Sequence, residues 1–447
     1  MVVYLKIRRL NRREVEVGVV GETKNNGFRY DVGEPRKNRI YIMDVTNRDG
    51  VQTARISLSK LQKTMLNIYL NQMGIHQSEM GFPALDHEKN YIEANLRLQE
   101  KGLLQPLVLS GWCRAKKEDV ELALEKTRLK HLNLSISVSQ IMTQGKFSGR
   151  MDRSDVIKMM VEAVKTAKDK GVEIVGVNAE DASRTDERYD EDYLIEFALA
   201  AKEAGADRIR YCDTLGYDRT ISIYDSVHRL AKAVQLPIEL HCHNDLGYAV
   251  ANSVEGAMGA IDAGVDAYIN TTVNGMGERA GNADLVSVIL ALTKSRGLRH
   301  GSSILDPKVD LKMAWKICNY VANAFGQPIP INQVGVGGNA FAHESGIHAD
   351  GMLKDRNNYE LYGPEELGIG EVEVRRIGRV ITTGEYGGLK GLLHVLEELG
   401  IESVDARETL HLVQYAWHHN QMELTADEIW LIANYPEEVR QILTVTP

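Results

Sequence analysis

The sequence predicts an α/β protein: a closed (β/α)8 (TIM) barrel, a linker and lid segment, and a small helical C-terminal domain. Three observations predict the barrel. Eight short apolar runs rich in β-forming residues follow one another, and segments with apolar residues at helical spacing separate them. The third observation concerns the connections, because no glycine-rich loop follows the first run, as it commonly does in an open doubly wound sheet. The open sheet remains the alternative architecture.

The eight predicted strands are short apolar runs that end in polar residues. They cover residues 39–46, 76–83, 104–112, 131–138, 172–180, 206–214, 238–245 and 267–275. Amphipathic segments such as 58–73, 154–171 and 192–206 repeat apolar residues at i, i+3, i+4 and i+7, which indicates helices, and several end in glycine. Parallel strands joined by such helices bring their carboxyl ends to one face, where barrel enzymes hold their catalytic groups.

The chain divides into four predicted regions. A basic N-terminal extension covers 1–39, the barrel 40–295, a linker and lid 296–370, and a helical domain 371–447. The extension holds ten Lys/Arg against five Asp/Glu. It is either a solvated face or a surface for an anionic partner, and we favour the solvated face.

Composition excludes several classes of protein. The 447 residues are 43% apolar and carry a net charge of −9, which argues against broad nucleic-acid binding. The sequence has no apolar run of about 18 residues, so we expect no membrane span. Its start is too charged for a signal peptide, and its four cysteines form no C-x-x-C pair. We therefore expect a soluble protein of the reducing cytoplasm.

The stretch "IELHCHND" (238–245) places two histidines one residue apart on a predicted strand. Residues i and i+2 of a strand point to the same face, so His241 and His243 project together. Asp49, after the first strand, can approach them in a closed barrel. Two imidazoles and a carboxylate suit Mg²⁺, Mn²⁺, Fe²⁺ or Zn²⁺ with open coordination positions. The alternatives are polar residues at a strand exit and, for Asp49, a turn residue.

Other polar residues gather at the predicted strand ends. They include Arg48, Glu79, Arg114, Glu180, Thr214 and Asn282. Each has a structural alternative: Glu79 could pair with a lysine, "EDASR" (180–184) could begin a helix, and the glycines of "NGMGERAGN" (274–282) could simply turn the chain. Charge this dense is costly in a core, so we expect it at the barrel mouth.

Six motifs in order resemble the isopropylmalate/homocitrate/citramalate synthase family. They are "DVTNRDGVQ", "EDASR", "CDTLG", "HCHNDLG", "NGMGERAGN" and "HESGIHADG". The resemblance covers residues 40 to about 360 and is strongest to homocitrate synthase of the nitrogen-fixation type. It implies a metal-dependent acyltransferase that condenses acetyl-CoA with 2-oxoglutarate and hydrolyses the thioester, giving homocitrate and CoA.

The resemblance also implies residue roles. Asp49, His241 and His243 resemble the metal ligands, with Asn282 as a fourth. Arg48 resembles the residue that stabilises the developing alkoxide, and Thr214 the contact to the substrate carboxylate. Glu79 and Glu180 match acidic positions, Glu180 orienting the group that enolises acetyl-CoA. His348 and Tyr359 resemble a catalytic pair on a lid that acts in a partner subunit, which implies a homodimer.

Several features depart from the family pattern or leave the substrate open. Thr46-Asn47 and Val51 are unusual in the first motif, and "GEYGG" (384–388) replaces a basic motif. Arg114, Ser135 and Ser137 are candidates for reading the distal carboxylate. The same condensation on 2-oxoisovalerate, pyruvate or oxaloacetate is the nearest alternative. An aldol-type lyase or carboxylase domain and a non-catalytic metal-binding protein are the others.

Overall fold

The computed structural model describes residues 37–185, 191–298, 304–370, 383–384, 387–402 and 405–444. Most of the basic extension, the expected start of the C-terminal domain at 371 and part of 384–388 lie outside these residues. Within the described ranges, no helix has both the length and the apolar character needed to cross a membrane.

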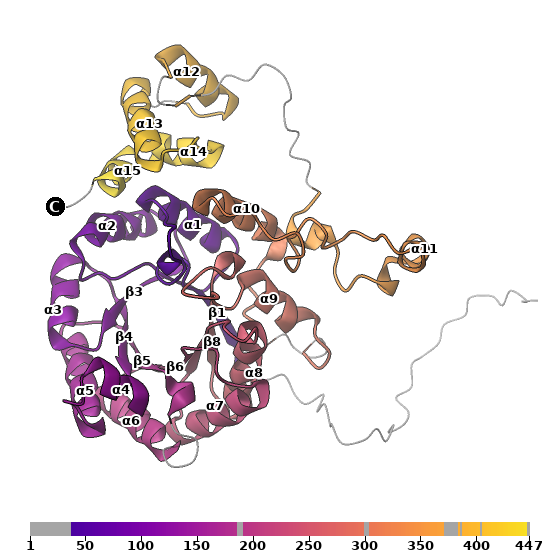
Figure 1. Ribbon diagram of the computed structural model, residues 1–447. Coiled ribbons are helices and arrows are strands. Elements are labelled where there is room, and N and C mark those ends of the chain that lie inside the picture. Colours follow the sequence, from indigo (N-terminus) through magenta and orange to yellow (C-terminus); the bar gives the residue numbers. More distant parts are fainter. Residues whose placement is uncertain are drawn as a thin grey trace, which may run out of the picture.

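Eight parallel strands close into one barrel in chain order (Figure 1). They are β1 (Ile40–Asp44), β2 (Gln77–Glu79), β3 (Val108–Arg114), β4 (His131–Ser137), β5 (Ile174–Glu180), β6 (Arg208–Asp213), β7 (Ile238–Cys242) and β8 (Ala267–Thr271). The barrel closes because β1 pairs with β8 along its full length, from Ile40 opposite Ala267 to Asp44 opposite Thr271. The predicted barrel is therefore confirmed, and the open sheet is excluded.

The strand boundaries differ most from the expected ones at β2, β3 and β8, where β8 ends at Thr271 rather than at 275. Only three residues of 76–83 form β2, and β3 starts at Val108 rather than at 104. Pro106 has no backbone N–H to donate to a neighbouring strand, so regular pairing begins after it. At its other end β3 continues to Arg114, which places that side chain on the barrel rim.

Helices surround the barrel between the strands (Figure 1). They are α1 (Lys60–Gln72), α2 (Asp86–Glu100), α3 (Lys117–Lys126), α4 (Gln140–Lys146), α5 (Arg153–Asp169), α6 (Glu191–Ala204), α7 (Thr220–Val234), α8 (Ala249–Asp262) and α9 (Leu285–Lys294). Capping fixes where the predicted ones begin: the Ser59 and Asp152 side chains accept hydrogen bonds from the third residues of α1 and α5.

The described residues beyond the barrel include six α-helices, and the C-terminal part from 387 to 444 is helical, as predicted. The six helices are α10 (Ala314–Phe325), α11 (Gly346–Lys354), α12 (Leu389–Glu398), α13 (Ala406–Asn420), α14 (Ala426–Asn434) and α15 (Pro436–Leu443). The α14 helix docks on α10, since the Tyr320 hydroxyl donates to Glu428 over 2.9 Å. It also docks on α1, where Tyr69 donates to Asp427 over 2.7 Å. In contrast, the segment with α11 projects away from the barrel (Figure 1).

Candidate active site

A polar cavity of about 250 Å³ opens where the strands end. Side chains from β3 to β7 and from the loops after β1, β6, β7 and β8 converge there because all eight strands run in one direction. The lining residues are Arg48, Asp49, Gln52, Trp112, Ser135, Asn178, Glu180, Arg210, Cys212, Thr214, His241, His243, Glu278 and Arg279.

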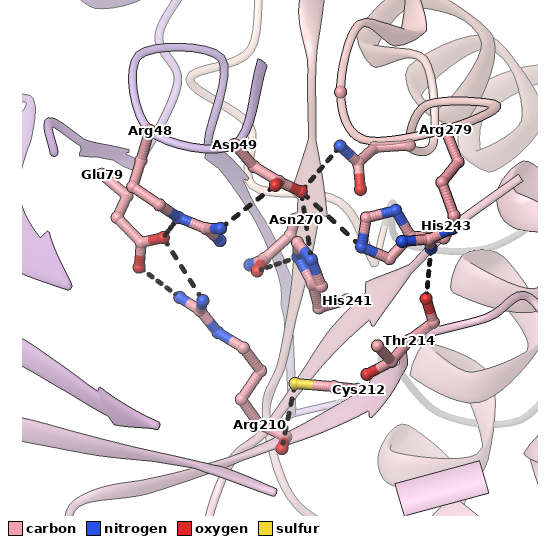
Figure 2. A network of polar contacts seen from close by, with 12 residues as sticks. Arg48, Asp49, Glu79, Arg210, Cys212, Thr214, His241, His243, Asn270 and Arg279 are labelled. Carbon is pink, nitrogen blue, oxygen red and sulfur yellow. Dashed lines mark hydrogen bonds and ion pairs between the residues drawn. The ribbon is translucent and has the colours of Figure 1, made fainter. Parts of the chain in front are cut away.

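Asp49, His241 and His243 form the centre of this cavity (Figure 2). The Asp49 Oδ2 atom lies 3.3 Å from His241 Nε2 and 3.7 Å from His243 Nε2. One ligand atom from each residue lies within 4.8 Å of the other two, and all three residues are buried. Strand alternation brings the imidazoles to the same face, and barrel closure brings Asp49 to them. The predicted trio is therefore assembled as a possible divalent-metal site.

The electrostatics of the trio suit metal ligation. Burial by itself would raise the pKa of Asp49, but Arg48 and the two histidines hold it well below its usual range. Burial, reinforced by His241, lowers the pKa of His243 to about 3. The Asn270 side-chain oxygen lies 3.0 Å from His241 Nδ1 and so holds Nε2 toward Asp49. A carboxylate and neutral imidazoles are the forms that bind a cation.

Asn282 lies directly beside the trio. Its Nδ2 donates to Asp49 Oδ2 over 2.9 Å, while its Oδ1 is buried without a hydrogen-bond partner. The loop that carries it requires glycine: Gly281 has φ +86°, and a Cβ there would lie 1.9 Å from the Gly275 carbonyl oxygen. In this arrangement Asn282 orients Asp49, and its role as a fourth ligand stays a prediction.

A column of alternating charges continues from the trio into the barrel core (Figure 2). Arg48 Nη1 lies 3.2 Å from Asp49, and Arg48 Nε donates to Glu79 over 2.6 Å. The other Glu79 oxygen accepts from Arg210 over 2.6 Å, and Arg210 Nε donates to Glu239 over 2.5 Å. Burial opposes the ionisation of Glu79, yet Arg210 and Arg48 lower its pKa to about 2. Charge therefore lies in the core as well as at the mouth.

Comparison with known proteins identifies the family. The sequence matches the HMGL-like family over residues 39–321. The chain belongs to the HMGL-like family. Residues 336–416 also match the family described as homocitrate synthase post-HMGL domain-like.

Two curated relatives are synthases. The chain is 55% identical to a citrate (Re)-synthase of Dehalococcoides mccartyi, and the match covers 92% of this chain and 99% of the relative. It is 39% identical to a 2-isopropylmalate synthase of Caldanaerobacter subterraneus, over 81% of this chain and 86% of that one. The predicted resemblance to condensing synthases is confirmed, and the protein is an acyltransferase of that kind. These relatives do not support specificity for 2-oxoglutarate.

A solved structure supports the fold. The hydroxymethylglutaryl-CoA lyase of Pseudomonas aeruginosa superposes with a TM-score of 0.53 at 18% identity, covering 66% of this chain and 95% of that one. At this identity the likeness concerns the barrel alone.

The cavity contains most of the site residues that the sequence predicts. Those that line it are Arg48, Asp49, Ser135, Glu180, Thr214, His241 and His243. Glu180 is held by two neighbours, since Ser137 donates to one of its oxygens over 2.6 Å and Lys146 lies 2.5 Å from the other. Glu79 is not among the lining residues: it is fully buried between Arg48 and Arg210. Its direct contact with substrate stays a prediction.

Three predicted residues lie elsewhere. Arg114 lines a neighbouring cavity that shares Trp112, Ser135 and Glu180 with the first, and its guanidinium is paired with Asp119 over 2.6 Å. His348 and Tyr359 stack on each other at 4.2 Å between ring centroids, on the α11 segment. Neither lines the polar cavity. Their catalytic roles stay predictions.

Sequence reasoning missed Arg210, Glu239, Asn270 and Trp112. A signal for Arg210 and Glu239 was present, because side chains two residues apart on a strand point to the same face. A residue two positions before one at the barrel mouth therefore points into the barrel. Glu239 stands two residues before His241 on β7, and Arg210 two residues before Cys212 on β6. Asn270 on β8 had no comparable signal, since only the fold brings it beside His241.

Proposed function

We propose that the protein is a citrate synthase: it condenses acetyl-CoA with oxaloacetate and hydrolyses the resulting thioester to citrate and CoA. The observation that carries this proposal is 55% identity to a citrate (Re)-synthase along 99% of that relative's length. Homocitrate synthesis from 2-oxoglutarate, the activity predicted from the sequence, is the second candidate. The match of residues 336–416 to a homocitrate synthase domain favours it.

The cavity lining supports a short dicarboxylic substrate. Ser135, Asn178 and Gln52 offer polar side chains, and Arg48 supplies positive charge. A branched aliphatic side chain such as that of 2-oxoisovalerate would leave polar groups such as the buried Asn178 amide without a partner, which costs free energy. Two oxo dicarboxylates, oxaloacetate and 2-oxoglutarate, are therefore favoured over 2-oxoisovalerate and pyruvate.

Asp49, His241 and His243, with Asn282 as a fourth candidate, would hold the divalent cation (Mg²⁺, Mn²⁺, Fe²⁺ or Zn²⁺). When bound, such a cation acts as a Lewis acid that polarises the ketone of a 2-oxo acid. The lowered pKa values of Asp49 and His243 and the fixed orientation of His241 fit this role.

The remaining residues place substrates and charge. Arg48, fixed by Glu79, stabilises the negative charge that develops on the ketone oxygen. Thr214 binds the carboxylate next to the ketone. Glu180 orients the group that removes a methyl proton from acetyl-CoA. Water then cleaves the thioester, which drives the condensation forward.

The lid completes the site from a second copy of the chain. His348 and Tyr359 stack as a pair on a segment that also exposes apolar side chains, with Ile347 76% and Leu353 89% exposed. Exposed apolar side chains of this size favour a covering partner. The lid at 296–370 and the helical domain at 371–447 are then appendages that serve a dimer of barrels at 40–295.

The test is a thiol-release assay with acetyl-CoA and Mn²⁺ across oxaloacetate, 2-oxoglutarate, pyruvate and 2-oxoisovalerate, with products identified by mass spectrometry. We expect oxaloacetate to give the highest kcat/KM and citrate as product. A higher value with 2-oxoglutarate would replace this proposal with the second candidate. The Asp49→Asn variant is the control, since it should release no CoA with any acid.

A further inference from the structure

We propose that Arg210 is a positioning residue for the condensation. Arg210 holds Glu79 between its own guanidinium group and that of Arg48, and thereby fixes Arg48 beside Asp49. This inference rests on the function proposed above and assigns a role to a residue deep in the barrel.

Arg210 is buried between two carboxylates. It is 1% exposed, and its contacts come from two strands: Glu79 on β2 at 2.6 Å and Glu239 on β7 at 2.5 Å. Asn270 also donates to Glu239 over 2.8 Å, which fixes that carboxylate in turn. A planar guanidinium that is hydrogen-bonded to carboxylates on two sides is fixed in orientation, so it can fix the orientation of its neighbours.

Glu79 transmits this rigidity to Arg48. One Glu79 oxygen accepts from Arg210 at 2.6 Å and from Asn133 at 2.8 Å. The other accepts from Arg48 Nε at 2.6 Å and, more weakly, from Arg210 Nη1 at 3.4 Å. Arg48 then presents Nη1 to Asp49. Because Arg48 is long and lies in the cavity, Glu79 fixes its orientation, and Arg210 together with Asn133 fixes the orientation of Glu79.

The same strand offers a matched control. Arg208 also points into the barrel, two residues before Arg210, and is 5% exposed. Its contacts are Gln77 at 3.0 Å and the face of the Tyr268 ring at 4.4 Å, and its nearest Glu239 contact is 4.0 Å. No contact joins Arg208 to Glu79. If buried arginines on β6 serve packing alone, the two positions should respond alike to Arg→Lys.

The experiment compares Arg210→Lys, Arg208→Lys, Glu79→Gln and the double variant Glu79→Gln/Arg210→Lys in the full chain. Lysine keeps the charge but cannot bridge two carboxylates with a planar fork. We expect R210K to lower kcat at least about tenfold while changing KM for acetyl-CoA less than about threefold, and R208K to stay within about twofold of wild type. If Arg210 acts through Glu79, the double variant is no slower than E79Q.

Two kinetic results would overturn the inference: equal losses in R210K and R208K, or a double variant slower than E79Q by the full R210K factor. A second readout needs no turnover. The Arg48 guanidinium carbon lies 5.7 Å from the Trp112 ring centroid. Displacement of Arg48 should therefore change Trp112 emission in R210K and not in R208K, with Trp112→Phe as the blank.

The emission readout separates this inference from the proposed function. Unchanged Trp112 emission in R210K refutes the positioning role whatever the substrate. Conversely, a wild-type protein that releases no CoA refutes the proposed function, while an emission change confined to R210K still supports the link from Arg210 to Arg48.

Discussion

Replacing Glu79 with glutamine tests the charge column at its centre. The change keeps the shape of the side chain but removes the negative charge between two buried guanidinium groups. Glu79 is fully buried and accepts hydrogen bonds from Arg48, Arg210 and Asn133. Glutamine would direct its own N–H group at Arg48, Arg210 or Asn133, each of which is itself a donor. Because the side chain is fully buried, water cannot replace the lost hydrogen bond.

Two estimates of the cost agree. Arg210 and Arg48 outweigh burial and set the pKa of Glu79 at about 2 instead of 4.5. At 1.36 kcal/mol per pH unit this difference is worth about 3 kcal/mol. Independently, breaking a buried ion pair by removing one partner typically costs about 3–5 kcal/mol. We therefore expect E79Q to lower the free energy of unfolding by about 3 kcal/mol.

The assay is urea unfolding followed by circular dichroism at pH 7, together with CoA release. Displacement of Arg48 should lower kcat about 100-fold, as loss of a preorganised charge at the reacting centre commonly does. Glu100→Gln is the control: Glu100 lies 2.6 Å from Arg128, as Glu79 does from Arg48, but that pair is exposed and is worth less than about 1 kcal/mol. Equal stability changes in E79Q and E100Q would refute the reasoning.

Three further predictions concern other parts of the chain. Gly281→Ala should lower kcat at least about tenfold, because its Cβ meets the Gly275 carbonyl oxygen; CoA release measures it. Burial lowers the pKa of Lys63 to about 8, so between pH 8 and 10 the unfolded chain binds a proton that the folded one does not. The wild-type free energy of unfolding, measured with urea, should therefore be higher at pH 10 than at pH 8. In Lys63→Met this rise should be absent. Tyr320→Phe should cost about 1–2 kcal/mol of unfolding free energy, because buried Glu428 loses a hydrogen bond across the α10–α14 contact.

The sequence could predict features that depend on short-range periodicity. Alternation along one strand placed His241 beside His243, and the repeat of strands and helices favoured a closed barrel. Closure then brought Asp49 to the histidines from the far end of the strand order. Each step used only the direction of side chains on a strand and the order of the strands.

Features that depend on side-chain contacts between different strands could not be predicted. The link from Arg210 to Glu79 joins β6 to β2, and that from His241 to Asn270 joins β7 to β8. Charged residues in a core also contradict the cost that sequence reasoning assigns to them, unless their partners are known. Substrate choice is harder still, because a few lining side chains decide it.

The most direct test of the account is Mn²⁺ binding measured by isothermal titration calorimetry on metal-free protein. The account predicts one ion per chain in the wild type and affinity reduced at least about 100-fold in both Asp49→Asn and His243→Ala. It would be contradicted by a wild-type chain that binds no ion, or by variants that bind Mn²⁺ as tightly as the wild type.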